Sequence, residues 1–85
     1  MKLHNLKIDS VYYSEIEYGI KTFELRKNDR DYEVFDLIHF VDTNGQDFKA
    51  NSNNVYQIVY ILRDAEKYGL DKDYCVLGIK RLQGN

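Results

Sequence analysis

The sequence predicts a small, mainly β domain with one or two short helices, and it favours a small β-barrel. Apolar and polar residues alternate in several short runs, which is the period of a strand. The chain also holds 8 Tyr and 4 Phe, which are common strand residues and large core side chains. At 85 residues it has room for one core, so residues 1–85 are expected to form a single domain.

The first third of the chain predicts a strand followed by a helix. Residues 3–9 alternate as a strand with its apolar side chains on one face. Residues 11–18 have helical spacing, with Ser10 as the expected N-cap. Gly19 is expected to end the helix, because glycine adopts the left-handed conformation without steric cost.

Residues 21–27 predict a second strand, and its faces decide what its charges can do. Phe23 and Leu25 point one way, and we expect them to enter the core. Glu24 and Arg26 lie on the opposite face, so they are expected to line a cleft or meet solvent. Leu25→Ala should then cost roughly 2–5 kcal/mol of stability.

The rest of the chain predicts further strands. Residues 55–62 are almost continuously apolar and are expected to form a central strand. The other expected elements are a turn at 28–31, strands at 37–42, 47–50 and 74–82, a hairpin turn at Asn44-Gly45, a loop at 51–54 and a helical turn at 64–70 ended by Gly69.

Composition excludes several classes of protein. A net charge of −2 counts against a general duplex-DNA binder, whose affinity comes from neutralising phosphates. One Cys and two His are too few for a structural zinc site, so we expect no metal and no disulfide. No motif for an NTPase or a dinucleotide enzyme occurs, and no cofactor is expected. No apolar run reaches the length of a membrane span, so a cytoplasmic location is expected.

Charge is distributed unevenly along the chain. Residues 19–30 hold four basic and two acidic side chains, against eight basic and twelve acidic elsewhere. A local positive region on an acidic protein favours an anionic or polar ligand at that place. The alternative is an exposed strip of ion pairs with little energetic weight.

This segment also carries a signature. Its residues, Gly19-Ile20-Lys21-Thr22-Phe23-Glu24-Leu25-Arg26, fit the pattern G-x-K-x-x-E-x-R. The pattern is typical of the ASCH domains of the PUA-like superfamily, and the chain resembles a small uncharacterised bacterial and phage branch of them. Further similar stretches are His4-x-Leu6-Lys7-Ile8, Tyr12-Tyr13, residues 26–31, Asp36-Leu37-Ile38 and Val76-Leu77-Gly78-Ile79-Lys80.

The resemblance implies a PUA-like barrel with a cleft that binds RNA or a nucleotide or nucleoside. The expected ligand-binding residues are Lys7, Lys21, Glu24, Arg26 and Arg30. The acidity of the whole chain favours a short single-stranded or nucleoside-like ligand, because proteins recognise RNA sequence mainly through unstacked bases.

Two alternatives remain open at this stage. Some ASCH relatives are amidohydrolases of acylated nucleosides, with a lysine matching Lys21 and a threonine nucleophile where this chain has Glu24. Lys21 as base and Glu24 as proton-transfer partner would here need an activated water. The second alternative is a phage or mobile-element protein that binds a host protein through an exposed apolar patch. The chain also has Phe35 where the branch usually has glycine.

Several other side chains have an ordinary structural explanation. His4 is expected to be partly buried and satisfied by backbone groups, His39 to be at the surface and Cys75 to be an inert buried thiol. Four tyrosines could stack on bases or serve as strand residues, and the structural role is favoured for each: Tyr56, Tyr60, Tyr68 and Tyr74.

Overall fold

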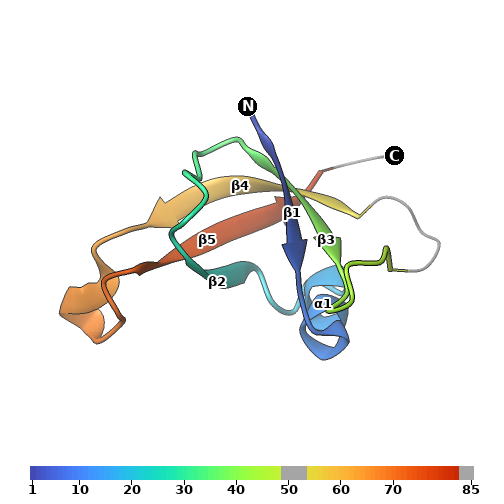
Figure 1. Ribbon diagram of the computed structural model, residues 1–85, viewed down its shortest axis with the longest axis horizontal. Helices are drawn as coiled ribbons and strands as arrows, with labels where there is room; N and C mark the ends of the chain where they lie inside the picture. The colour runs from blue at the N-terminus through green and yellow to red at the C-terminus, as the bar shows by residue number, and fades with distance from the viewer. Residues whose placement is uncertain (49–53, 83–85) are drawn as a thin grey trace.

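Among the residues that the computed structural model describes, five strands form one sheet that curls into a half-barrel (Figure 1). The structure describes residues 1–48 and 54–82. The elements in chain order are β1 (Leu3–Lys7), α1 (Ser10–Glu17), β2 (Phe23–Lys27), β3 (Leu37–Val41), β4 (Val55–Leu62), the 3₁₀-helix η1 (Ala65–Tyr68) and β5 (Tyr74–Arg81). The mainly β fold predicted from the sequence is confirmed. The sheet curls as a small β-barrel requires and forms a half-barrel.

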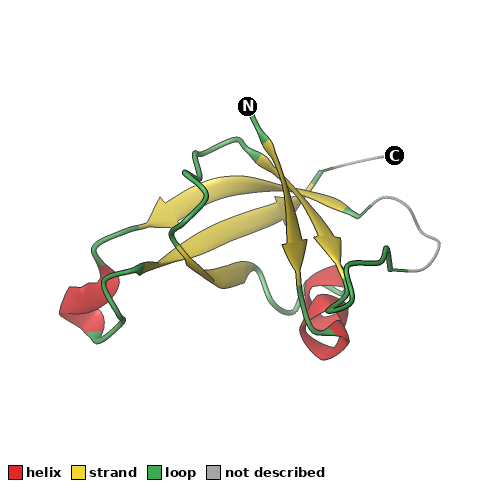
Figure 2. Cartoon of the chain, viewed as in Figure 1, coloured by secondary structure: helices red, strands yellow, loops and turns green. Residues whose placement is uncertain are grey.

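The strand order is β1-β3-β4-β5-β2, so the two strands nearest the N-terminus lie at opposite edges of the sheet. β1 pairs in parallel with β3, and every other pairing is antiparallel. Figure 2 shows α1 across the end of the half-barrel where β1 and β3 finish, and η1 at the far end of the β4–β5 pair. Among the described residues no helix is both long and apolar enough to cross a membrane.

The core fills the concave side of the sheet. Side chains from β1, β3, β4 and β5 alternate into it, as the period of two requires. α1 closes one end with Tyr13 and Ile16, which are both buried. The residues that are completely buried at the centre are Leu6, Ile38, Phe40, Ile58, Cys75 and Leu77.

The predicted helix is confirmed, and its cap lies one residue earlier than expected. Asp9, rather than Ser10, caps α1, and its carboxylate accepts the Val11 N–H at 2.9 Å. Gly19 follows the last turn with a φ of +78°, as predicted for a glycine at this place.

The prediction for β2 has the right alternation and the wrong face. Phe23 and Leu25 are 49% and 47% exposed, whereas Glu24 is only 5% exposed and faces the concave side. The pairing with β5 sets this orientation, since Glu24 lies opposite Leu77, a core residue. Hydropathy predicted the reverse because it counts a glutamate as an outward residue, whereas ion pairs with Lys21 and Arg26 allow Glu24 to be buried.

The predicted hairpin after β3 forms a turn with little strand after it. Gly45 has a φ of +82°, and the Asp42 carboxylate accepts the N–H groups of Asn44 and Gln46 at 2.8 and 3.0 Å. An isolated bridge joins Val41 and Asp47 in place of a strand. The rest of the strand predicted at 47–50, and most of the loop predicted at 51–54, lie outside the described residues.

The C-terminal elements follow the prediction closely. β4 is the middle strand of the sheet, and its register shifts between Ile58 and Tyr60, where a bulge interrupts the ladder to β5. The helical turn predicted at 64–70 is η1, and Gly69 ends it with a φ of +96°.

Candidate functional site

The segment between α1 and β2 places Lys21 just before the first residues of β2. The N–H groups of Ile20 and Lys21 both donate to the Glu15 carbonyl, at 2.8 and 3.0 Å. These two bonds fold the chain back against the last turn of α1, so Lys21 lies between the end of α1 and the first residue of β2. The local structure of the signature segment therefore depends on the helix terminus at Gly19.

Glu24 is the centre of a partly buried ion-pair cluster. The Lys21 ammonium donates to Glu24 Oε1 and also, at 2.7 Å, to the Phe23 carbonyl. Arg26 Nε donates to Glu24 Oε2 at 3.0 Å, and Arg26 Nη2 lies 2.9 Å from the same oxygen. The side chains of Lys21, Glu24 and Arg26 are 16%, 7% and 21% exposed, so water screens their attraction only partly. Two cations around one carboxylate leave the cluster with one positive charge.

Two arginines reach across the opening of the half-barrel to the other edge strand. Arg26 Nη2 donates to the Lys7 carbonyl at 2.6 Å, and Arg30 Nη1 donates to the Asn5 carbonyl at 3.3 Å. Both acceptors are on β1, which lies at the opposite edge of the sheet from β2. Side chains, rather than a backbone ladder, therefore connect the two edges.

A cavity of about 620 Å³ lies in this opening. Glu24, Lys21 and Arg26 are among its charged lining residues. Tyr12 and Phe23 flank Lys21, whose ammonium lies 5.8 and 4.9 Å from their ring centroids. The described residues that line it are Lys7, Ile8, Asp9, Tyr12, Lys21, Phe23, Glu24, Leu25, Arg26, Lys27 and Tyr74. We call this space the first cavity.

Four of the five ligand-binding residues predicted from the sequence line the first cavity: Lys7, Lys21, Glu24 and Arg26. Arg30 does not line it. Arg30 lines an adjoining cavity of about 660 Å³, together with Lys7 and Arg26, which belong to both. The structure therefore brings the predicted residues together, although the predicted orientation of β2 was wrong.

The aromatic and aliphatic walls of the first cavity were missed at the level of sequence. The sequence predicts Phe23 and Leu25 in the core, and nothing in it marks Tyr12 as a ligand contact. The signal for Tyr12 was weak, since nothing local distinguishes an exposed helical tyrosine that meets a cavity from one that meets water. Of the four tyrosines for which the sequence favours a structural role over stacking on bases, Tyr74 lines this cavity.

The other three tyrosines have other places. Tyr56 is 2% exposed and packs edge-on against Phe40 with centroids 5.5 Å apart, so it is a core residue. Tyr60 and Tyr68 are exposed and lie away from the first cavity. A structural explanation therefore holds for Tyr56.

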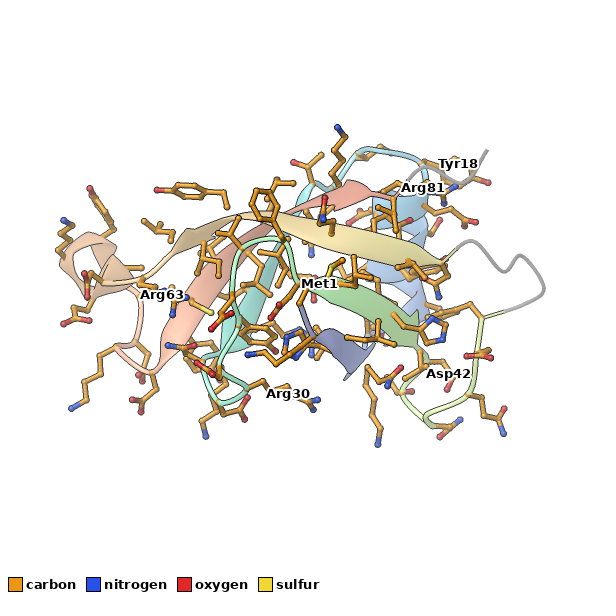
Figure 3. The ribbon with its side chains drawn as sticks, turned by 90° about the horizontal axis from the view of Figure 1, so that it is seen from above. Met1, Tyr18, Arg30, Asp42, Arg63 and Arg81 are labelled. Atoms are coloured by element: carbon orange, nitrogen blue, oxygen red, sulfur yellow. The ribbon has the colours of Figure 1, made fainter. Side chains whose placement is uncertain are left out.

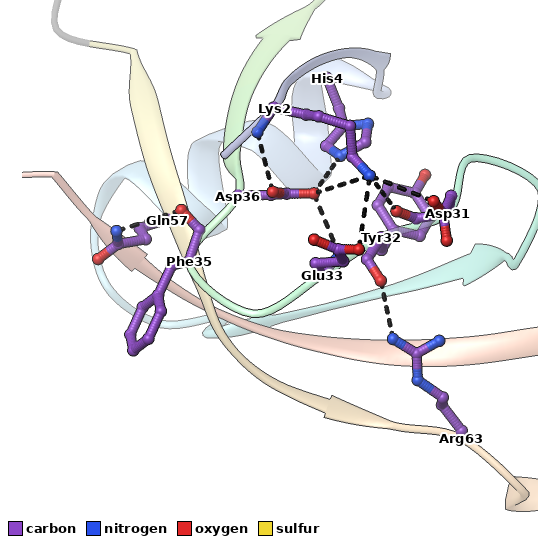
Figure 4. Close-up of polar contacts among 9 residues, drawn as sticks. All are labelled: Lys2, His4, Asp31, Tyr32, Glu33, Phe35, Asp36, Gln57 and Arg63. Atoms are coloured by element: carbon purple, nitrogen blue, oxygen red, sulfur yellow. Dashed lines mark hydrogen bonds and ion pairs between the residues drawn. The ribbon is translucent and has the colours of Figure 1, made fainter.

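His4 belongs to a buried polar cluster beneath the start of β1 (Figure 4). Its Nε2 lies 2.8 Å from Asp36 Oδ2, so a carboxylate satisfies it, where backbone groups were expected. Asp36 also accepts the N–H groups of Lys2 and Glu33, at 2.9 and 3.1 Å. Burial by itself would raise the pKa of Asp36, but these hydrogen bonds outweigh it and lower that pKa to about 2. The Tyr32 ring packs on His4 at 4.8 Å and completes the cluster.

The remaining candidates fall outside the first cavity. Cys75 is completely buried, as predicted, and burial raises the pKa of its thiol. His39 is partly buried and contacts Asp47 Oδ1 through Nε2 at 2.7 Å. Over residues 1–48 and 54–82, no group of three or more His, Cys, Asp or Glu side chains is arranged to hold a metal ion.

The convex face of the sheet near β2 is apolar. Phe23 lies opposite Gly78, which in turn lies opposite Tyr60, and Leu25 lies opposite Val76 in the next row. Phe23, Leu25 and Tyr60 are each about half-exposed or more. An apolar surface of this kind is the feature that the protein-binding alternative requires.

Comparison with known families places the chain. The model of a family described as a domain of unknown function (DUF3850) matches residues 3–79. The chain belongs to the DUF3850 family. The match runs from the first residue of β1 into β5, so the DUF3850 domain includes both cavities and every residue that lines them. No curated protein matches the DUF3850 chain.

Proposed function

We propose that this DUF3850 domain binds a nucleoside unit, either of single-stranded RNA or of a free nucleotide, in the first cavity. The observation that carries the proposal is the Glu24 carboxylate, which is held between Lys21 and Arg26 in the wall of a ligand-sized cavity. A volume of about 620 Å³ falls within the range typical of small-molecule sites, roughly 300–1,000 Å³.

Glu24 is suited to accept hydrogen bonds from a base or a ribose. An ionised carboxylate has about four lone-pair positions. Lys21 occupies a position on Oε1 and Arg26 contacts Oε2, which leaves capacity for a ligand N–H or O–H. The two cations also fix the carboxylate in place, so little side-chain entropy is lost when a ligand binds.

The other walls suit the flat face of a base. Tyr12, Phe23 and Tyr74 are each at least a third exposed and line the cavity together with aliphatic side chains. Stacking of a base on an aromatic ring is worth roughly 1–3 kcal/mol and tolerates any base. Polar recognition by Glu24 and stacking on these rings would together select a nucleoside over a simple anion.

The resemblance to ASCH domains supports the same assignment. The signature residues Lys21, Glu24 and Arg26 are the ones that the contacts join into one cluster. We therefore propose membership of the PUA-like superfamily, together with a role as an RNA- or nucleotide-binding module.

The lining favours a binding site over a hydrolase. Among the described residues, the first cavity has no Ser, Thr or Cys side chain in its wall. Thr22, the hydroxyl nearest in sequence to Glu24, lines a different cavity of about 390 Å³ beside Ile79. A hydrolase would therefore depend on Lys21 and Glu24 to activate water.

The test is an NMR titration of the wild-type chain with the four common ribonucleosides and a short single-stranded oligoribonucleotide. We expect shifts to cluster on Lys21, Glu24 and Tyr12. Glu24→Gln keeps the shape of the side chain and one oxygen, so it should retain the fold and part of the affinity. Lys72→Ala, an exposed residue of the η1–β5 loop, is the control and should change nothing.

Turnover is measured on the same samples by chromatography of acylated cytidines. A binding module shows no turnover in the wild type. Wild-type turnover that disappears in both Glu24→Gln and Lys21→Met would replace the binding proposal with a hydrolase. Absence of shifts at the first cavity with every probe would reject the nucleoside site itself.

A further inference from the structure

The cavity that contains Arg30 differs from the first cavity in its chemistry. Among the residues that the structure describes, its lining combines basic side chains with the turn after β3 and has no aromatic ring other than the imidazole of His39. Figure 3 shows Arg30 and the Asp42 turn along the same side of the molecule. We call this space the second cavity, and its lining is Asn5, Lys7, Arg26, Arg30, His39, Val41, Gly45 and Asp47.

The two cavities adjoin at one contact. Lys7 and Arg26 line both of them. Arg26 Nη2 donates to the Lys7 carbonyl at 2.6 Å, so the Arg26 guanidinium lies between the two spaces. A ligand that reaches from one cavity to the other must pass this guanidinium.

Two basic side chains of the second cavity, Lys7 and Arg30, are not neutralised by a carboxylate of the described residues. Lys7 and Arg30 are exposed, and within residues 1–48 and 54–82 neither pairs with a carboxylate. Residues 49–53 and 83–85 contain no Asp or Glu. The one acidic side chain in the lining, Asp47, is already in contact with His39 at 2.7 Å.

Both cations are positioned by contacts of their own. Arg30 uses one N–H group on the Asn5 carbonyl, at 3.3 Å, and its other donors make no hydrogen bond within residues 1–48 and 54–82. The Lys7 side chain passes Gly45, where its Cε lies 3.8 Å from the position that a Cβ would take. The turn after β3 therefore directs Lys7 toward the second cavity.

The free edge of β1 adds backbone donors. At the two ends of β1, the Ile8 N–H donates to the Val41 carbonyl and the Lys2 carbonyl accepts from the Leu37 N–H. The backbone groups of the even-numbered residues therefore face β3. Residues alternate along an edge strand, and the N–H groups of Asn5 and Lys7 therefore point to the open side. Amide and guanidinium donors that converge in this way suit a phosphate.

We propose that the second cavity holds the phosphate of a nucleotide whose base lies in the first cavity, with Arg30 and Lys7 as the phosphate ligands and Arg26 between the two groups. This inference rests on the proposed function and extends it by assigning the phosphate. The phosphate can belong to a free nucleotide or to an RNA strand, since both present the same group to the second cavity.

The experiment compares each ribonucleoside with its 5′- and 3′-monophosphates by calorimetry, on the wild type, Arg30→Met and Arg30→Lys. Arg30 lines the second cavity and not the first, so the nucleoside affinity should stay constant across these variants. We expect one of the monophosphates to bind the wild type about tenfold or more tightly than the nucleoside, as a charge-assisted contact allows. Arg30→Met should remove most of that gain, Arg30→Lys should restore part of it, and Lys72→Met should leave it intact.

The outcomes separate the two proposals. The phosphate site would be overturned if nucleosides bind and their monophosphates bind no more tightly. It would also be overturned if the higher affinity of the monophosphate survives in Arg30→Met. Either result would leave the nucleoside site in the first cavity unaffected. Inorganic phosphate that shifts the Arg30 and Lys7 resonances while no nucleoside affects Glu24 would overturn the nucleoside site, and with it the linked arrangement. A hexaribonucleotide that competes better than the mononucleotide identifies RNA as the source of the phosphate, and equal competition identifies a free nucleotide; both support the inference.

Discussion

Glu24 lies in an environment that differs from the one its chemistry predicts. Glu24 is buried on the concave side of the sheet, where an unpaired carboxylate would be costly. Lys21 and Arg26 offset that cost through the contacts that also shape the first cavity. The same three side chains thus serve the fold and the candidate site.

Asp36 makes stability depend on acid pH. Its pKa is lowered from 3.8 to about 2, so the folded state favours the ionised carboxylate more than the unfolded state does. This stabilisation is present above about pH 4 and is lost as the pH falls toward 2. We expect the free energy of unfolding to drop by roughly 2 kcal/mol across that range from this group.

Urea unfolding at a series of pH values measures the effect, with Asp36→Asn as the comparison. The variant should be less stable at neutral pH and should lose less stability on acidification. An identical acid dependence in both proteins would mean that another carboxylate is responsible.

Phe35 has a backbone conformation that suits glycine. Its φ is +82°, and its N–H donates to the Ile58 carbonyl at 2.7 Å, which holds the strained conformation in place. A φ of this kind costs of order 1–3 kcal/mol for a residue with a side chain. The ring is 62% exposed and contributes little packing, so Phe35→Gly should raise stability by about 1 kcal/mol after the added freedom of the unfolded chain.

The reciprocal change is the control for Phe35→Gly. Gly69 has a φ of +96° and no atom within 4 Å of an added Cβ, so Gly69→Ala tests backbone strain without a clash. It should cost about 1 kcal/mol in thermal or urea unfolding. A loss of stability in Phe35→Gly would show that the exposed ring has a packing role.

At the scale of elements, β2 is held by β5 on one side and is open on the other. Phe23 and Leu25 lie on the convex face, where they are opposite Gly78 and Val76. Toward the open side, Arg26 and Arg30 replace a backbone ladder and contact β1. Charged side chains thus occupy a strand edge that would otherwise be open to pairing with another chain.

The orientation of β2 leads to a direct comparison of two leucines. Leu25 is 47% exposed on the convex face, so Leu25→Ala should cost less than about 1 kcal/mol, far below the value expected from the sequence alone. Leu77 is completely buried in β5 opposite Glu24, so Leu77→Ala should cost about 2–5 kcal/mol. Urea unfolding of both variants is the measurement. Similar losses in the two would contradict the faces assigned to β2.

For the whole molecule, the charge pattern separates local from diffuse attraction. The net charge of −2 opposes any general attraction to nucleic acid, whereas five of the twelve basic side chains are among the described residues that line the two adjoining cavities. A ligand should therefore make few phosphate contacts, in one place.

Ligand affinity should respond accordingly to charge and salt. Arg26→Ala should weaken oligoribonucleotide binding far more than Lys72→Ala, because Arg26 lies between the cavities and Lys72 is on the η1–β5 loop. The slope of log affinity against log salt should be shallow, of order 1–3, as expected for few phosphate contacts. Calorimetry or fluorescence anisotropy at several salt concentrations measures both. Equal losses from the two substitutions would indicate diffuse attraction and contradict a defined cleft.

The sequence by itself determined the elements and the residues that matter. Alternation located β1 and β2, and a nearly continuous apolar run located β4. Glycines at positions 19 and 69 marked helix ends, and the signature segment brought attention to Lys21, Glu24 and Arg26. These features are local, because a strand period, a positive φ and a cluster of charges can each be recognised within a few residues.

The tertiary structure alone decided which way β2 faces and what surrounds its charges. Both faces of residues 21–27 alternate equally well, so periodicity could not choose between Glu24 inside and Leu25 inside. The choice depends on Leu77 across the ladder and on cations that reach Glu24 through folding, including Arg26 anchored on Lys7 in a distant edge strand. The same long-range closure places Arg30 beside Lys7 and creates the second cavity, since residues far apart in the chain become neighbours only when the sheet curls.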